Sequence, residues 1–307
     1  MTSEFQLLMI SAMYENGGNV THRLFDGHPQ LYVYPFESQL GTRHVSDLLS
    51  SVYPAKYRWP EFPLQSSPEE DYEAIADEEC KVRIKTPSAS KFSQAQIDLS
   101  DQERKEAFVQ YLRERQRSRA RIVEAFFRAN FEAWRGFRRS GSERMYVGYS
   151  PIVAVDAEKI LGDFPSAQLL HVVRNPWSAY ADTKKRPVPL SLAHYVTAWV
   201  LCQQLVLFYR SRSPGHVHLL RYEDAIENPE KVLGSFCSSI GLAPSHALSQ
   251  PSWNGTPLAE VSPWGTIRKP TPQGNRKAAG ELTTAEQEEI RERARPLLRE
   301  LGYDKGF

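Results

Sequence analysis

The chain has 307 residues, of which 41% are hydrophobic and 24% charged, a composition typical of a soluble globular protein with one large α/β domain or two modest ones. Lys and Arg total 38 against 37 Asp and Glu, so the net charge is only +1 and does not favour binding to nucleic acid or to an anionic membrane. No stretch approaches the roughly 20 uninterrupted apolar residues of a membrane span, and the N-terminus lacks a signal-peptide pattern, so we expect a cytoplasmic protein without a membrane span.

The N-terminal segment predicts a strand, a loop and a helix. Residues 5–10 (FQLLMI) form a short apolar run that suits a strand buried on both faces. Gly17 and Gly18 lie in the loop that follows. Residues 19–27 then predict a short helix, and a second strand is expected near Leu31–Val33.

Residues 38–140 follow a different pattern. They are rich in Pro, Ser and charged residues to about residue 70, and the run KVRIKTP at 81–87 resembles a short strand. Residues 101–137 predict one or two amphipathic helices. Acidic residues interrupt the basic run RERQRSRAR within them, so we interpret that run as a solvated helix face rather than a nucleic-acid site.

The second half returns to alternating strands and helices. The strand-like runs MYVGYSP, AQLLHVVRNP and VHLLRYED are separated by predicted helices at about 154–163 and 190–211, an order that indicates a parallel sheet. A helix closed by Gly241 and a Pro, Gly and Ser-rich segment at 243–280 follow. The three cysteines are widely spaced, which favours buried thiols over disulfides or a zinc site.

Three polar stretches follow predicted strands directly: YENGGN, RNPWSAY and RYED. Ligands of parallel sheets bind at the carboxyl ends of the strands, where helix N-termini present free N–H groups. The first loop matches neither GxGxxG nor GxxxxGK[ST], so neither a dinucleotide fold of the usual kind nor a P-loop NTPase is supported.

Several segments together resemble the sulfotransferase family. They are the strand, glycine loop and LFDGHP at the start, then FPSAQLLHVVRNPWSAYA, HLLRYEDAIENPEKVLGSFCSSIGL and GELTTAEQEEIRERARPLLRELGYD. The resemblance covers residues 5–37 and 146–307 and implies one three-layer α/β domain over 1–307, with a central parallel sheet of P-loop-NTPase-like topology. Residues 38–140 would be a mostly helical insertion on the acceptor side, and 243–280 a C-terminal lid loop.

The resemblance also implies a donor, 3′-phosphoadenosine 5′-phosphosulfate, with no metal, and assigns residues to it. Arg174 stands where the family binds the 3′-phosphate, and Tyr222 where a tyrosine lies near the adenine. A surface salt bridge for Arg174 and core packing for Tyr222 are the alternatives. The expected donor-binding set is Asn16, Gly17, Gly18, Asn19, Arg174, Asp182, Tyr222, Arg268 and Lys269.

Several residues depart from the family pattern, and in the loop Asn16 replaces a serine and Gly18-Asn19 a threonine pair. Glu15 stands where a basic loop residue is expected, Tyr149 replaces a lysine, and Asp182 replaces a serine. A carboxylate ~4 Å from a phosphate opposes binding by about 4 kcal/mol at an effective dielectric of 20. Main-chain amides of the glycine loop can still bind an anion, and residues 184–186 (KKR) supply cations that could equally be a solvated helix end.

Glu37, after the second predicted strand, resembles the family's general base and is the predicted catalytic residue, with a helix-capping or surface role as the alternative. The resemblance thus predicts transfer of a sulfuryl group to a hydroxyl of a small metabolite, lipid or glycan. Two alternatives stay open: a changed donor, or a noncatalytic binding protein on the same fold. The oligomeric state is open too.

Overall fold

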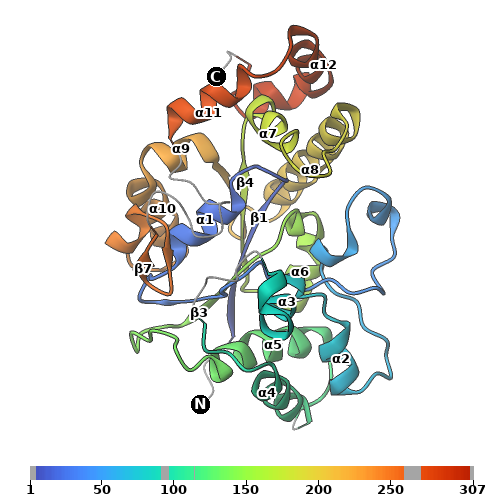
Figure 1. The fold of residues 1–307 in the computed structure, drawn as a ribbon, viewed down its shortest axis with the longest axis vertical. Helices are drawn as coiled ribbons and strands as arrows, with labels where there is room; N and C mark the ends of the chain where they lie inside the picture. Colours follow the sequence, from blue (N-terminus) through green and yellow to red (C-terminus); the bar gives the residue numbers. More distant parts are fainter. Residues whose placement is uncertain (1–4, 91–96, 114, 259–270, 305–307) are drawn as a thin grey trace.

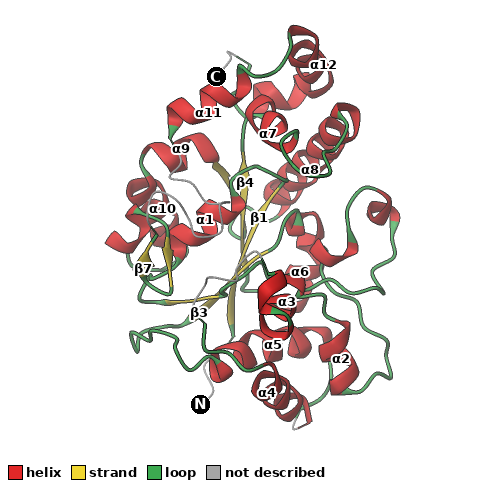
Figure 2. Ribbon diagram, in the orientation of Figure 1, coloured by secondary structure: helices red, strands yellow, loops and turns green. Residues whose placement is uncertain are grey.

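The computed structural model describes residues 5–90, 97–113, 115–258 and 271–304. Within these residues a parallel sheet has the strand order β2-β3-β1-β4-β5, seen nearly edge-on in Figures 1 and 2. All five predicted strands of this sheet are confirmed. Their bounds are β1 Gln6–Ala12, β2 Leu31–Val33, β3 Met145–Tyr149, β4 Gln168–Val173 and β5 Val217–Arg221.

Helices cover both faces of the sheet, which confirms the predicted three-layer α/β fold. Leu8 and Ile10 of β1 point into a core shared with α1, α9 and α10, whereas Leu7 and Met9 point into the core on the α5 and α6 side. Successive residues of a strand face opposite sides, so the continuous apolar run of β1 is explained by two buried faces. The helices of this half are α1 Gly18–Phe25, α6 Ala157–Asp163, α7 Pro176–Thr183, α8 Leu192–Arg212, α9 Tyr222–Glu227 and α10 Pro229–Ser239.

The helices of the insertion are drawn in cyan and green in Figure 1, and α5 packs in the core on one face of the sheet. These helices are α2 Pro68–Ala74, α3 Glu78–Lys85, α4 Asp101–Arg113 and α5 Arg119–Ala133. The prediction of a strand at 81–87 was wrong, because these residues lie mainly in α3. Glu78 and Glu79 in its first turn and Arg83 and Lys85 in its last turn match the helix dipole, a signal that the alternation of Val and Ile obscured.

The basic run at residues 113–121 lies at the junction of α4 and α5 and is paired with acids rather than merely solvated. Arg117 donates to Asp71 at 2.7 Å, and Arg121 donates to Glu124 at 2.7 Å. These acids neutralise positive charge of the run within the fold, which leaves less of it to attract nucleic acid.

Two arginines of the insertion region are buried with their acids. Arg104 is fully buried and binds Asp77 at 2.7 Å, and Arg58, 1% exposed, binds Asp156 at 2.7 Å. A buried charge requires such a partner, since the unpaired ion would be strongly destabilising.

Several described residues of the predicted lid loop, 243–280, lie in strands and a helix. After the small hairpin of β6 (Ser252–Trp253) and β7 (Thr256–Pro257), residues 272–279 form α11 (Pro272–Ala279) instead of the loop expected there, followed by α12 (Thr284–Glu300). Thr271 caps α11 and Pro272 occupies its first position, a helix start that the sequence contained.

In the described part of the chain, one helix passes a length and composition test for a membrane span. This helix is α8, with 39% of the tested window buried in the fold. It packs against the core with residues of α7 and α12. A core helix of a soluble protein passes the same test, so the finding is a weak indication of a span.

Candidate functional site

The loop after β1 ends in an uncapped helix. Asn16 N–H donates to Met13 O at 3.0 Å, and Gly17 has a left-handed backbone (φ 88°), which turns the chain into α1 at Gly18. No side chain accepts a hydrogen bond from the first turn of α1 in the described structure. The amides of Gly17, Gly18 and Asn19 are thus available to an anion, with the positive end of the helix dipole behind them.

Both glycines are needed because tyrosine rings press against the loop. A Cβ atom on Gly17 would overlap the ring of Tyr222, and one on Gly18 would overlap the ring of Tyr149. Tyr222 begins α9 directly after β5, and Tyr149 ends β3. The glycine pair is therefore a close approach of backbone to two aromatic rings as well as a turn.

Asn16 connects the loop to the end of β4. Its Oδ1 accepts from the backbone N–H of Arg174 at 2.9 Å and from Trp199 Nε1 at 3.2 Å, while its Nδ2 donates to Tyr14 O and to Tyr195 Oη. These four bonds use the full capacity of the amide. The side chain of Asn16 thus holds the loop in place and has no polar position free for a phosphate.

Arg174 lies beside the loop, as predicted, at the carboxyl end of β4. Its Nε donates to Asn275 Oδ1 at 2.7 Å, and its Nη1 donates to Glu15 O and Asp182 Oδ2, each at 2.8 Å. The guanidinium lies 5.0 Å from the ring centroid of Tyr222. Its Nη2 makes no hydrogen bond with a described residue, so one edge of the fork is free.

A second network behind Arg174 was missed from the sequence. The Glu223 carboxylate accepts from Asn175 Nδ2 at 2.8 Å, from Asn275 Nδ2 at 3.1 Å and from Tyr303 Oη at 2.7 Å. It joins the ends of β4 and β5 to α11 and to the C-terminal segment. Asn275 gave no sequence signal, because its partners lie about 50 and 100 positions away.

Glu37 lies at the other side of the loop, 7% exposed. Asn19 Nδ2 donates to its Oε1 at 3.2 Å, and Gln39 Nε2 donates to its Oε2 at 3.1 Å. Both carboxylate oxygens are thus oriented by amides. Its backbone N–H donates to Glu79 Oε2 at 3.3 Å, which places a residue of α3 beside it. The structure therefore brings Glu37, Asn19 and the start of α1 together.

The cations predicted near Asp182 are each paired with acids. Lys185 Nζ lies 3.0 Å from Asp182 Oδ1 and 2.8 Å from Glu281 Oε2, and Arg186 Nε lies 3.7 Å from Glu15 Oε1. Partial burial raises the pKa of Glu15, an effect that Arg186 opposes and Asp182 adds to. The rim of the loop is thus a balanced set of half-exposed charges.

The LFDGHP motif anchors the C-terminal hairpin. Asp26 is 5% exposed, forms an ion pair with Arg23 at 3.1 Å and accepts from the N–H groups of Asn254 and Gly255, each at 2.9 Å. His28 Nε2 lies within hydrogen-bond distance of the Ala243 carbonyl oxygen, at 2.9 Å. These residues hold the 252–257 segment against the end of α1.

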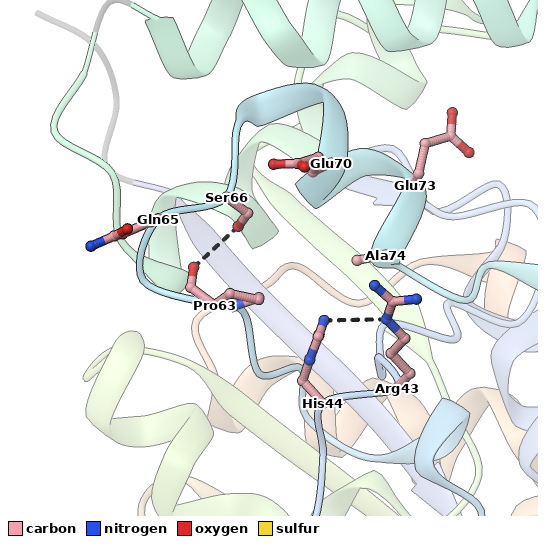
Figure 3. Close-up of a pocket in the computed structure, with 8 residues that line it drawn as sticks. All are labelled: Arg43, His44, Pro63, Gln65, Ser66, Glu70, Glu73 and Ala74. Atoms are coloured by element: carbon pink, nitrogen blue, oxygen red, sulfur yellow. Dashed lines mark hydrogen bonds between the residues drawn. The ribbon is translucent and has the colours of Figure 1, made fainter.

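A cavity lies elsewhere. It has a volume of about 500 Å³ within the insertion, and Figure 3 shows Arg43 and His44 side by side on its wall, across from α2. None of the described residues predicted for the site lines it. Arg268 and Lys269, predicted to belong to the donor-binding set, lie outside the described residues, and their role stays a prediction.

Comparisons with known proteins identify the family and support the fold. The profile of the Sulfotransferase family matches residues 17–245. The sulfotransferase domain of the olefin synthase from Synechococcus PCC 7002 superimposes with a TM-score of 0.53 at 17% identity, covering 95% of each chain. The sulfotransferase domain from the curacin biosynthetic pathway gives 0.53 at 15% identity, covering 95% of this chain and 98% of the other. No curated protein sequence matches.

Proposed function

The chain belongs to the sulfotransferase family, and on that premise we propose that this enzyme transfers a sulfuryl group from 3′-phosphoadenosine 5′-phosphosulfate to a hydroxyl of a small metabolite, lipid or glycan. One observation carries the proposal. The uncapped start of α1 lies between an arginine with a free edge, Arg174, and a carboxylate oriented by the same loop, Glu37. An anion site flanked by a second cation and a base suits transfer from a doubly anionic nucleotide.

The donor would be held at two points. The amides of Gly17, Gly18 and Asn19 would bind the 5′-phosphosulfate, because a helix N-terminus favours negative charge. Arg174 would bind the 3′-phosphate through its free edge, and the fork geometry of a guanidinium suits a phosphate. The carboxylate of Asp182 competes for the same guanidinium, so donor binding should displace or tolerate it. Arg268 and Lys269 are proposed to add positive charge.

The chemistry follows from the position of Glu37. In a loose in-line displacement the acceptor hydroxyl attacks the sulfur while the bond from sulfur to the 5′-phosphate oxygen breaks. Glu37 would accept the hydroxyl proton, and the amides of Asn19 and Gln39 keep its two oxygens in place. The reaction needs no metal.

The acceptor would approach from the insertion. Glu79 of α3 contacts the backbone of Glu37, and the rings of Tyr14 and Tyr57 lie 5.9 Å apart between the loop and the insertion. Of these residues, Tyr57 and Glu79 belong to the part of the chain outside the sequence resemblance, where acceptor specificity is expected. Three free, buried thiols support a cytoplasmic location.

Two measurements test the proposal. Isothermal titration with 3′-phosphoadenosine 5′-phosphate should give binding to the wild type, and Arg174→Ala should weaken it by roughly 10- to 100-fold, the effect of losing a charged hydrogen-bond partner. No heat at high micromolar nucleotide would contradict this donor and favour the altered-donor alternative, which Glu15 and Asp182 at the rim support.

Transfer of radiolabelled sulfate to a panel of hydroxyl acceptors tests the enzyme itself. Glu37→Gln should lower the rate by about 100-fold or more while nucleotide binding persists. Glu132→Gln, at an exposed position of α5, is the matched control and should leave the rate unchanged. Equal rates in Glu37→Gln and the control would remove Glu37 as the base.

A further inference from the structure

The hydroxyl end of the Tyr149 side chain lies against the first residue of α1. Tyr149 is the last residue of β3 and is 5% exposed. A Cβ atom on Gly18 would lie 2.6 Å from the Tyr149 hydroxyl oxygen, and Gly18 is the first residue of α1. The phenol is thus buried against the turn whose amides are available to an anion.

The Tyr149 hydroxyl has no partner among the residues that the structure describes. It forms no hydrogen bond with a described residue, although the Tyr149 carbonyl accepts from Ser38 N at 2.7 Å and from Ser38 Oγ at 3.1 Å. The Tyr149 hydroxyl oxygen is not completely buried, unlike the Tyr14 hydroxyl oxygen, which is buried without a hydrogen-bond partner. A polar group that is otherwise buried and yet opens onto the mouth of a site requires an explanation, because buried polar groups are almost always paired.

The surroundings keep this group protonated. Burial raises the pKa of Tyr149 well above its usual value, and the nearby Glu37, Tyr57, Glu15 and Glu79 raise it further. The phenol is therefore a neutral donor throughout the physiological range. Acids lie near it and the first residue of α1 lies against its ring, so a ligand that accepts hydrogen bonds and is held by the amides of α1 would be in place to accept from it.

We propose that the Tyr149 hydroxyl donates a hydrogen bond to the sulfuryl group of the bound donor and is a catalytic residue of the transfer. This inference rests on the proposed function, since it needs the 5′-phosphosulfate at the start of α1. In the step, the bond from the acceptor oxygen to sulfur forms and the bond from sulfur to the phosphate oxygen breaks. The acceptor proton goes to Glu37, and Tyr149 keeps its own proton while it stabilises charge on the sulfuryl oxygens.

The test compares two nucleotides that differ only in the sulfuryl group. Wild type, Tyr149→Phe and Tyr146→Phe are titrated with 3′-phosphoadenosine 5′-phosphosulfate and with 3′-phosphoadenosine 5′-phosphate. Tyr146 is the matched control because it lies on the same strand but stacks on Tyr32 at 4.7 Å in the core of the other face. Tyr149→Phe keeps the ring on Gly18, so its unfolding midpoint should equal that of the wild type.

Tyr149→Phe should weaken binding of the phosphosulfate by roughly 10- to 100-fold and leave binding of the desulfated nucleotide unchanged. Tyr146→Phe should change neither. An unchanged ratio of the two affinities in Tyr149→Phe, through equal losses or none, would overturn the role of Tyr149 while the proposed donor stands. A wild type that binds neither nucleotide would overturn the proposed donor, and this inference with it.

Discussion

Arg104 in the insertion and Arg174 beside the glycine loop are both buried arginines, yet they differ in their hydrogen-bond partners. Arg104 is fully buried and donates to Asp77, Tyr72 and Asp101, so every nitrogen of its guanidinium has a partner. Arg174 has partners on Nε and Nη1 only, and its acid, Asp182, has a side chain that is 31% exposed. We call an arginine sealed when all its guanidinium nitrogens have partners inside the protein, as in Arg104, and we expect it to have a structural role. An open arginine such as Arg174, with one unpaired nitrogen and a partly exposed acid, can bind an anion.

The largest expected effect comes from removing Arg104 from its buried cluster with Asp77, Tyr72 and Asp101. Arg104→Ala should lower the free energy of unfolding by about 3–5 kcal/mol, because Asp77 remains buried without its cation. Urea unfolding measures this change. Arg113→Ala, in the same helix but 68% exposed, is the control and should cost less than about 0.5 kcal/mol. Similar costs in the two variants would contradict the contrast between sealed and open arginines.

His171 extends the comparison to the sheet. It is fully buried between Ser11 Oγ and Gln203 Oε1, each 3.1 Å away, and burial lowers its pKa from 6.5 to about 4. Between these values the unfolded chain binds a proton that the native protein does not. Stability should therefore fall as the pH drops from 6.5 to about 4, by about 3 kcal/mol from this residue.

Urea unfolding across this pH range checks the prediction for His171. A His171→Gln variant should lose this part of the pH dependence, although it is less stable at neutral pH. If wild type and variant show the same slope, His171 is not neutral in the native protein.

The smallest expected effect concerns Asp182, the acid paired with Arg174. Asp182→Asn removes the carboxylate that competes for Arg174, so the affinity for 3′-phosphoadenosine 5′-phosphate should rise by about two- to fivefold at low salt, as expected for a half-exposed ion pair. Titration at two salt concentrations measures it. Weaker binding would mean that Asp182 is needed to orient the guanidinium.

The sequence predicted the sheet and the meeting of three strand ends because those features depend on local patterns. Apolar runs fix buried strands, and the order of strands and helices fixes a parallel sheet whose carboxyl ends share one edge. Gly17, Arg174 and Tyr222 are brought together by that rule alone, and the structure confirms their proximity.

Two kinds of feature were not predicted: helix α3, where local signals conflict, and side-chain roles that depend on contacts between distant positions. Val82 and Ile84 alternate with charged residues as they would in a strand, yet the charges at both ends of α3 favour a helix. Asn275 and Glu223 acquire their roles only when α11 packs beside α7 and α9. The free hydroxyl of Tyr149 is likewise a property of packing, since the sequence showed only that a lysine of the family pattern was missing.

A crystal structure with 3′-phosphoadenosine 5′-phosphate bound tests the central claim most directly. We expect the 5′-phosphate on the amides of Gly17, Gly18 and Asn19, and the 3′-phosphate on the free edge of Arg174 beside Tyr222. A nucleotide bound in the cavity of the insertion instead, with the start of α1 contacting only protein or solvent, would contradict the account.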